Sequence, residues 1–152
     1  MQTLTQAAPR TEEILKLRST LNQALELYSY NKNSRSYKYI LRSYAMIEIF
    51  INGLISKELK ELRRQDINFE DQTIFVRNGE VGHQRISLRE ENAVSILKEY
   101  FDIYRFDPND LIFPISQLSQ SHVISQTINF WFSKAGINHE KGTHAAHSLG
   151  KW

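Results

Sequence analysis

The stretch that most constrains the fold of this chain runs over residues 44–88. It opens with apolar residues at three- and four-residue spacing, which give a helix one apolar face: Tyr44, Ile47, Phe50 and Ile51. Asn52-Gly53 follows and predicts the end of that helix, because glycine adopts the left-handed C-cap conformation without steric cost. A buried helix with a defined end is therefore expected at the start of this stretch.

The rest of the same stretch predicts a short helix and a β-hairpin. Ser56 is a suitable N-cap, and Glu58 would lie in the first turn of the helix, where a negative charge is favourable. Residues 73–77 and 84–88 read as two strands on either side of a glycine-containing tip at residues 78–83. The hairpin is the β-structure that the sequence predicts.

Helical patterns account for most of the remaining chain. Thr11 precedes an apolar stripe that reaches Tyr28, and a second helix is expected to begin at residues 34–36. Further helices are predicted over residues 90–104 and from residues 119–121 to a stop at 135–137, with a short buried extended piece at 111–114. The fold class expected is mainly α with a small β-hairpin.

Length and composition limit the possible classes of protein. At 152 residues the chain suits one domain, which we assign to residues 11–152 after a flexible arm at 1–10. A formal net charge of +2 allows nucleic-acid binding without requiring it. The absence of cysteine excludes disulfides and thiolate metal sites, which suits the cytoplasm, and no apolar run approaches a membrane span.

Three segments in order carry a resemblance to a known family. Residues 52–59 read Asn-Gly-Leu-Ile-Ser-Lys-Glu-Leu, residues 62–67 read Leu-Arg-Arg-Gln-Asp-Ile, and the hairpin follows. This layout resembles the catalytic domain of the tyrosine recombinases, the phage-integrase family, with its Thr-Gly-Leu-Arg-Ile-Ser-Glu-Leu box. Residues 141–152 are similar to the family string Gly-Thr-His-Ser-Leu-Arg-Lys. The family histidine would be His144 or His147, and we favour His147 because it keeps the His-x-Leu-x spacing.

The resemblance implies a catalytic set that this sequence largely lacks. In the family a tyrosine attacks the scissile phosphate, two arginines hold its oxygens, and a hairpin lysine protonates the leaving hydroxyl. The first arginine falls on Ile55, the lysine on Glu80 and the second arginine on Gly150, while His147 is retained. The tyrosine would lie beyond Trp152. We therefore expect a degenerate, C-terminally incomplete catalytic domain that is not an enzyme and needs no cofactor.

The functional expectation is weak binding of double-stranded DNA by a protein from a mobile element, in the context of recombination or integration. The resemblance implies contacts with phosphates from six residues: Lys57, Arg63, Arg64, His83, Arg85 and Lys151. The alternative is an interaction protein, either a homodimer or a partner of an active recombinase, and a third possibility is a remnant without function. The homodimer would use apolar residues near the C-terminal end: Phe130, Trp131, Phe132 and Trp152.

Two other patterns in the sequence contain residues that could bind a ligand. Arg35, Tyr37, Lys38, Tyr39 and Arg42 mix cations with aromatic rings, which suits either a nucleic-acid strand or an ordinary packed and solvated helix start. His144 and His147 stand three residues apart, but no third ligand has a convincing spacing, so no metal site is expected.

Overall fold

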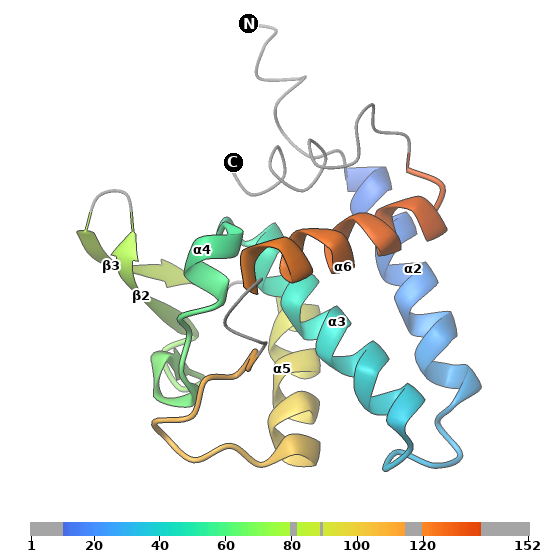
Figure 1. Cartoon of the computed structure of the whole chain (residues 1–152), viewed down its shortest axis with the longest axis horizontal. Helices are drawn as coiled ribbons and strands as arrows, with labels where there is room; N and C mark the ends of the chain where they lie inside the picture. Colours follow the sequence, from blue (N-terminus) through green and yellow to red (C-terminus); the bar gives the residue numbers. More distant parts are fainter. Residues whose placement is uncertain (1–10, 80–81, 89, 115–119, 138–152) are drawn as a thin grey trace, which may run out of the picture.

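A computed structural model describes residues 11–79, 82–88, 90–114 and 120–137. The elements it describes are α2 (Thr11–Leu27), α3 (Arg35–Ile51), α4 (Ser56–Leu59), the 3₁₀ turn η1 (Arg64–Asp66), β1 (Ile67–Asn68), β2 (Thr73–Gly79), β3 (Gly82–Ser87), α5 (Glu91–Tyr104) and α6 (Gln120–Lys134). Helix α3 packs against α2, α5 and α6, and the sheet lies on the side away from α2 (Figure 1). The expected class, mainly α with a small antiparallel sheet, is confirmed.

Helix α3 is the central helix, and the sequence explains both of its ends. Ser34 precedes it in an extended conformation, and its side chain accepts a hydrogen bond from the Tyr37 N–H at 3.1 Å. Eight consecutive residues from Ser43 to Phe50 are buried, so this half of the helix has no solvent-facing side. Gly53, at φ 113°, then ends the helix as predicted.

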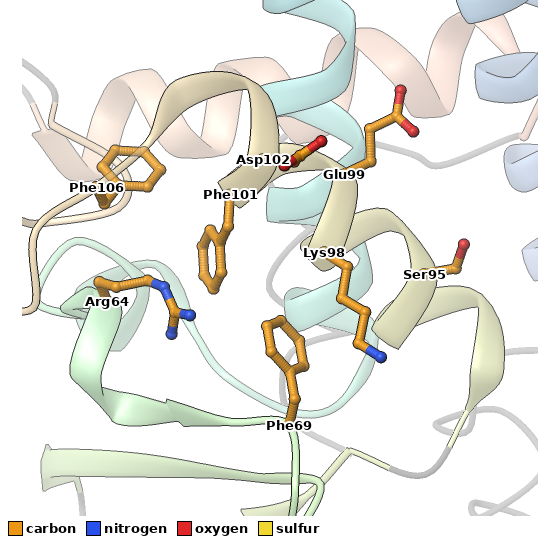
Figure 2. A pocket seen from close by; sticks show the side chains of 8 residues that line it. All are labelled: Arg64, Phe69, Ser95, Lys98, Glu99, Phe101, Asp102 and Phe106. Atoms are coloured by element: carbon orange, nitrogen blue, oxygen red, sulfur yellow. The ribbon is translucent and has the colours of Figure 1, made fainter.

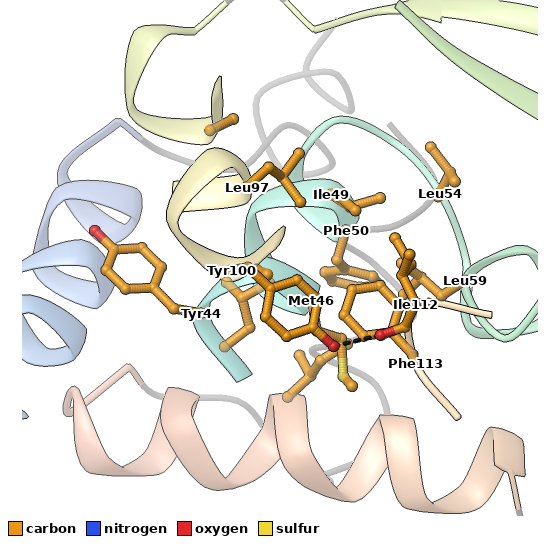
Figure 3. Close-up of a cluster of buried hydrophobic side chains, with 14 of the residues drawn as sticks. Tyr44, Met46, Ile49, Phe50, Leu54, Leu59, Leu97, Tyr100, Ile112 and Phe113 are labelled. Carbon is orange, nitrogen blue, oxygen red and sulfur yellow. Dashed lines mark hydrogen bonds between the residues drawn. The ribbon is translucent and has the colours of Figure 1, made fainter. Parts of the chain in front are cut away.

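Buried contacts of Tyr100 join α5 to the extended segment before α6. Tyr100 is fully buried, its hydroxyl donates to the carbonyl oxygen of Ile112, and its ring stacks on Phe113 with centroids 5.7 Å apart (Figure 3). The same burial raises the pKa of the Tyr100 hydroxyl. Ile112 and Phe113 are fully buried, as the sequence predicts for this apolar piece.

The sheet has three antiparallel strands in the order β1-β2-β3, one more than the predicted hairpin. Its register pairs Phe75 with Arg85, and the pairing of β2 with β3 reaches Gly79 and Gly82, beyond the predicted strand ends. The extra strand β1 has two residues and turns back onto β2 through Asn68, whose Oδ1 accepts the Asp71 N–H at 2.9 Å. A strand of two residues is too short to show the alternation of apolar and polar residues that predicts a strand from sequence.

Helix α6 buries two of its three consecutive aromatic residues and exposes the third. Trp131 and Phe132 are buried, with 2% and 3% of their surface exposed, whereas Phe130 is 50% exposed. One of the three faces away from the core because neighbouring helical positions point about 100° apart, so three consecutive side chains cannot all face the same core. Gly136, at φ 78°, ends the helix, and the Ile137 N–H returns to the Phe132 carbonyl at 3.0 Å.

A buried carboxylate links three helices. Glu48 of α3 has no exposed surface, and its two oxygens accept hydrogen bonds from Nε and Nη2 of Arg18 on α2, both at 2.8 Å. Asn92 of α5 donates to the same carboxylate at 2.6 Å and to the Tyr44 hydroxyl at 3.0 Å. Arg18 also reaches Glu90, just before α5, at 2.7 Å. The buried carboxyl group of Glu48 therefore has a cation and an amide donor as partners inside the core.

None of the described helices has the length and apolar character needed to cross a membrane. The proposed arm at residues 1–10 lies outside the described residues.

Because Glu48 depends on Arg18, we expect Arg18→Met to lower the free energy of unfolding by about 3–5 kcal/mol, the usual cost of an uncompensated buried charge. Lys16 lies exposed on the same helix, so Lys16→Met should change the free energy of unfolding by less than about 0.5 kcal/mol. Urea denaturation of both variants measures the difference. Equal and small effects would show that Glu48 does not need its partner.

Candidate nucleic-acid interface

Helix α4 begins directly after the end of α3, and Ile55 occupies its cap position. The Ile55 carbonyl accepts the N–H groups of Glu58 and Leu59 at 2.9 and 3.0 Å, and its own N–H donates to Glu58 Oε1 at 3.0 Å. The helix therefore starts at Ser56, so Ser56 is the first helical residue and not the cap that the sequence suggested. Leu54 and Leu59 are fully buried and hold this turn against the core.

The outer face of the sheet carries an aromatic ring surrounded by cations. Phe75 stacks on His83 with ring centroids 5.6 Å apart and an interplanar angle of 28°. The guanidinium carbons of Arg77 and Arg85 lie 5.4 and 5.5 Å from the Phe75 ring centroid. Side chains alternate along a strand, so these four residues share the face opposite buried Ile74 and Val76. We call Phe75, Arg77, His83 and Arg85 the sheet face.

One arginine of the sheet face fixes the hairpin to the body of the domain. Arg77 forms an ion pair with Asp66, which is only 3% exposed. The other oxygen of Asp66 accepts the Arg63 N–H at 2.9 Å. A buried carboxylate needs such partners, so the pair sets the position of β2 relative to η1. Arg85 and His83 are exposed, and no carboxylate of the described residues pairs with them.

The structure brings some of the predicted contact residues together and separates others. Lys57 is exposed on α4, which packs against β2, so it lies on an element next to the sheet. In Figure 1, α4 stands beside the hairpin that carries His83 and Arg85. Lys57, His83 and Arg85 are thus solvent-accessible on adjoining elements.

Arg63 and Arg64 are instead engaged within the protein. Arg63 Nη1 donates to the carbonyl oxygen of Asn109 at 2.6 Å. The Arg64 guanidinium lies over the Phe101 ring at 4.3 Å and near Phe69 at 5.6 Å (Figure 2). Arg64 lines a pocket that contains both positively and negatively charged side chains. Its lining residues are Arg64, Phe69, Ser95, Lys98, Glu99, Phe101, Asp102 and Phe106. The two arginines therefore hold the turn after α4 against α5 and the 107–110 segment.

Comparison with known proteins identifies the family of this chain. The model of the phage integrase family matches residues 17–150. The chain belongs to the phage integrase family. A search of curated proteins found no match. The domain is also similar to a solved structure titled "Crystal structure of XerA recombinase", with a TM-score of 0.59 and 22% sequence identity. The likeness covers 85% of this chain and 45% of the XerA chain, and at this identity it shows a shared fold.

Several residues singled out in this phage integrase-family sequence lie outside the described residues. These are Glu80, His144, His147, Gly150, Lys151 and Trp152. Of the positions where the resemblance placed catalytic groups, the structure therefore describes Ile55, whose aliphatic side chain offers no hydrogen bond. Within the described ranges no group of three or more histidines and carboxylates could hold a metal ion.

Phe75 and Arg77 are the sheet-face residues that our sequence prediction missed. Period-two alternation along the predicted strand 73–77 places Phe75 and Arg77 on one face, and the observed register, which pairs Phe75 with Arg85, adds Arg85 and His83 to that face. The register needed to see this depends on the length of the tip, which the sequence leaves open.

Proposed function

We propose that this phage integrase-family domain binds double-stranded DNA through the sheet face and α4, without cleaving it. The observation that carries the proposal is the exposed pair Arg85 and His83 beside Phe75, next to exposed Lys57 on α4. Cations on a rigid sheet and a helix end suit the regular spacing of phosphates along a duplex. Membership of the phage integrase family supports a role connected with DNA integration or recombination.

The proposed absence of cleavage is supported by the residues that stand where the family resemblance places its catalysts. Ile55 cannot donate a hydrogen bond to a phosphate oxygen, Gly150 has no side chain, and Glu80 would place negative charge beside the phosphates. Each lost contact to the developing charge typically costs about a hundredfold or more in rate. The role we propose is that of a DNA-binding protein carried by a mobile element and acting in the cytoplasm of its host.

We expect the Arg85→Gln variant to bind random-sequence duplex DNA more weakly than wild type. It should also reduce the magnitude of the slope of log K against log salt by about 0.9, since one phosphate contact is lost. Fluorescence anisotropy at several salt concentrations measures both quantities. Lys16→Gln removes the same charge from α2, on the side of the molecule away from the sheet, and is the matched control.

The same experiment contains a gain-of-binding arm. Glu80→Lys reverses a charge at the hairpin tip and should increase both the affinity for duplex DNA and its salt dependence. If Arg85→Gln and Lys16→Gln behave alike and Glu80→Lys changes nothing, the hairpin does not contact DNA.

For catalysis, we expect no covalent protein–DNA adduct with nicked duplex substrates that trap such intermediates, and no relaxation of supercoiled plasmid. Denaturing gel electrophoresis of labelled DNA is the measurement, with an active tyrosine recombinase on its own nicked site as positive control. A phosphotyrosine-linked adduct would overturn the assignment of an inactive domain.

A second candidate function is self-association through α6. Phe130 is 50% exposed and makes an edge contact with the buried Trp131, whose ring centroid lies 5.2 Å away. Trp131 and Phe132 belong to the core of this chain, so of the three neighbouring aromatic residues Phe130 is the one that offers a partner substantial surface. An apolar contact of this kind would survive high salt, unlike binding to DNA.

If α6 mediates self-association, Phe130→Ser should lower the average mass measured by light scattering at high protein concentration and high salt. Leu27→Ser is the matched control, because Leu27 is 71% exposed at the end of a different helix. A wild-type monomer at every concentration, or equal effects of both variants, would exclude the interface.

A further inference from the structure

A second basic and aromatic surface lies on the first half of α3. Arg35, Lys38, Tyr39 and Arg42 stand at positions i, i+3, i+4 and i+7, so they share one face of the helix. Together with Ser36 and with Tyr104 of α5 they line an open groove of about 540 Å³. We call these lining residues the α3 groove.

The α3 groove has positive charge without local compensation. Its lining contains three cations and no carboxylate. Among the residues that the structure describes, Arg35, Lys38 and Arg42 take part in none of the ion pairs. Mutual repulsion between such groups is reduced when an anion binds between them.

The position of the cations near the start of α3 also favours the binding of an anion. A helix N-terminus carries partial positive charge, and acidic residues normally occupy its first turn. Helix α2 follows this rule with Glu12 and Glu13, but α3 has Arg35 as its first residue and no acid in its first turn. The arrangement is unfavourable for the helix by itself and favourable for holding an anion.

The aromatic residues of the groove are arranged for contact with a ligand. Tyr39 is 41% exposed. Tyr104 is fixed beside it, because its hydroxyl donates to the Lys38 carbonyl at 2.8 Å and the Lys38 ammonium lies 5.8 Å from its ring centroid. Tyr37, by contrast, is buried at 4% exposure and donates to Glu99, so it belongs to the core. An exposed ring among cations can stack on an unpaired base.

The groove is separate from the proposed duplex-binding surface. Arg35 begins α3 and Ile51 ends it, so about 24 Å of helix separates Arg35 from the end that leads to α4. Figure 1 shows the start of α3 at the opposite end of the molecule from the hairpin. A ligand in the α3 groove would therefore leave the sheet face accessible.

We infer that the α3 groove binds single-stranded nucleic acid, with Arg35, Lys38 and Arg42 on successive phosphates and one base stacked on Tyr39. A duplex would fit this chemistry less well, because its bases are already stacked and cannot reach the tyrosine ring. The shared feature of the ligand is a phosphodiester chain with unpaired bases, and DNA and RNA remain to be distinguished by experiment. The inference does not depend on the proposed duplex binding.

The test is fluorescence anisotropy of wild type and variants with labelled 12-nucleotide oligo-dT and, in a parallel arm, oligo-U. The double variant Arg35→Gln/Lys38→Gln should bind oligo-dT roughly tenfold more weakly and reduce the magnitude of the salt slope by about 1.4, or 0.7 for each phosphate contact. Tyr39→Ala should lose about fivefold or more, while Tyr39→Phe retains binding because it keeps the ring. Preferential binding of oligo-U in the second arm would identify RNA as the ligand.

Three controls make the result decisive. Lys16→Gln/Lys98→Gln removes two exposed lysines from other surfaces and should leave oligo-dT binding close to wild type. Arg85→Gln, which changes the sheet face, should weaken oligo-dT binding far less than Arg35→Gln/Lys38→Gln does. Circular dichroism melting curves establish that each variant is folded, and the Tyr39→Phe and Tyr39→Ala pair separates stacking from folding. No binding of either oligonucleotide by wild type, equal losses in the lysine control, or loss only with Arg85→Gln would overturn the inference.

Discussion

The burial of one carboxylate organises this domain. Glu48 sits in the fully enclosed half of α3, and its charge is balanced by Arg18 of α2 and hydrogen-bonded by Asn92 of α5. An unpaired charge at this depth would be strongly unfavourable, so α2 and α5 must dock with their side chains in register around α3. Arg18 also reaches Glu90, which ties the beginning of α5 to the same point. The three helices are therefore positioned relative to one another by a specific polar contact as well as by apolar packing.

The fixed position of α3 determines what lies at each of its ends. At its C-terminal end, Gly53 turns the chain and Leu54 and Leu59 seat α4 against the core, next to the sheet. The Arg77–Asp66 pair then fixes the sheet face beside α4. At its N-terminal end, α3 presents an uncompensated cluster of cations beside Tyr39. The two basic surfaces therefore lie near opposite ends of α3: the α3 groove at its N-terminal end, and the sheet face beside α4, which follows its C-terminal end.

Local signals in the sequence predicted the elements well. Ser34 and Asn52-Gly53 mark the ends of α3 because capping depends on neighbouring residues alone. Family resemblance was equally informative, since the family model covers residues 17–150. The tyrosines of α3 show that local sequence signals do not by themselves predict which side chains are buried. Tyr37 and Tyr39 belong to one basic and aromatic pattern, but they point in different directions on the helix, and packing buries Tyr37 while Tyr39 stays exposed.

Interactions between distant segments were the part that the sequence could not provide. Arg63 and Arg64 resemble solvent-exposed cations of a DNA-binding turn, yet they contact Asn109 and Phe101, more than 35 residues away. The two-residue strand β1 likewise depends on its pairing with β2 and not on any period of its own. The sheet face itself needs the register of the hairpin, which is a property of the paired strands.

Duplex binding by this phage integrase-family domain is proposed to take place on the sheet face and α4. The most direct test is a titration of isotope-labelled protein with a short duplex, in which the amide chemical shifts are monitored by NMR. We expect the shifts to concentrate in β2, β3 and α4, around Phe75, Arg85 and Lys57. Shifts confined to the α3 groove, to α6 or to the pocket around Arg64, with the sheet unaffected, would contradict it.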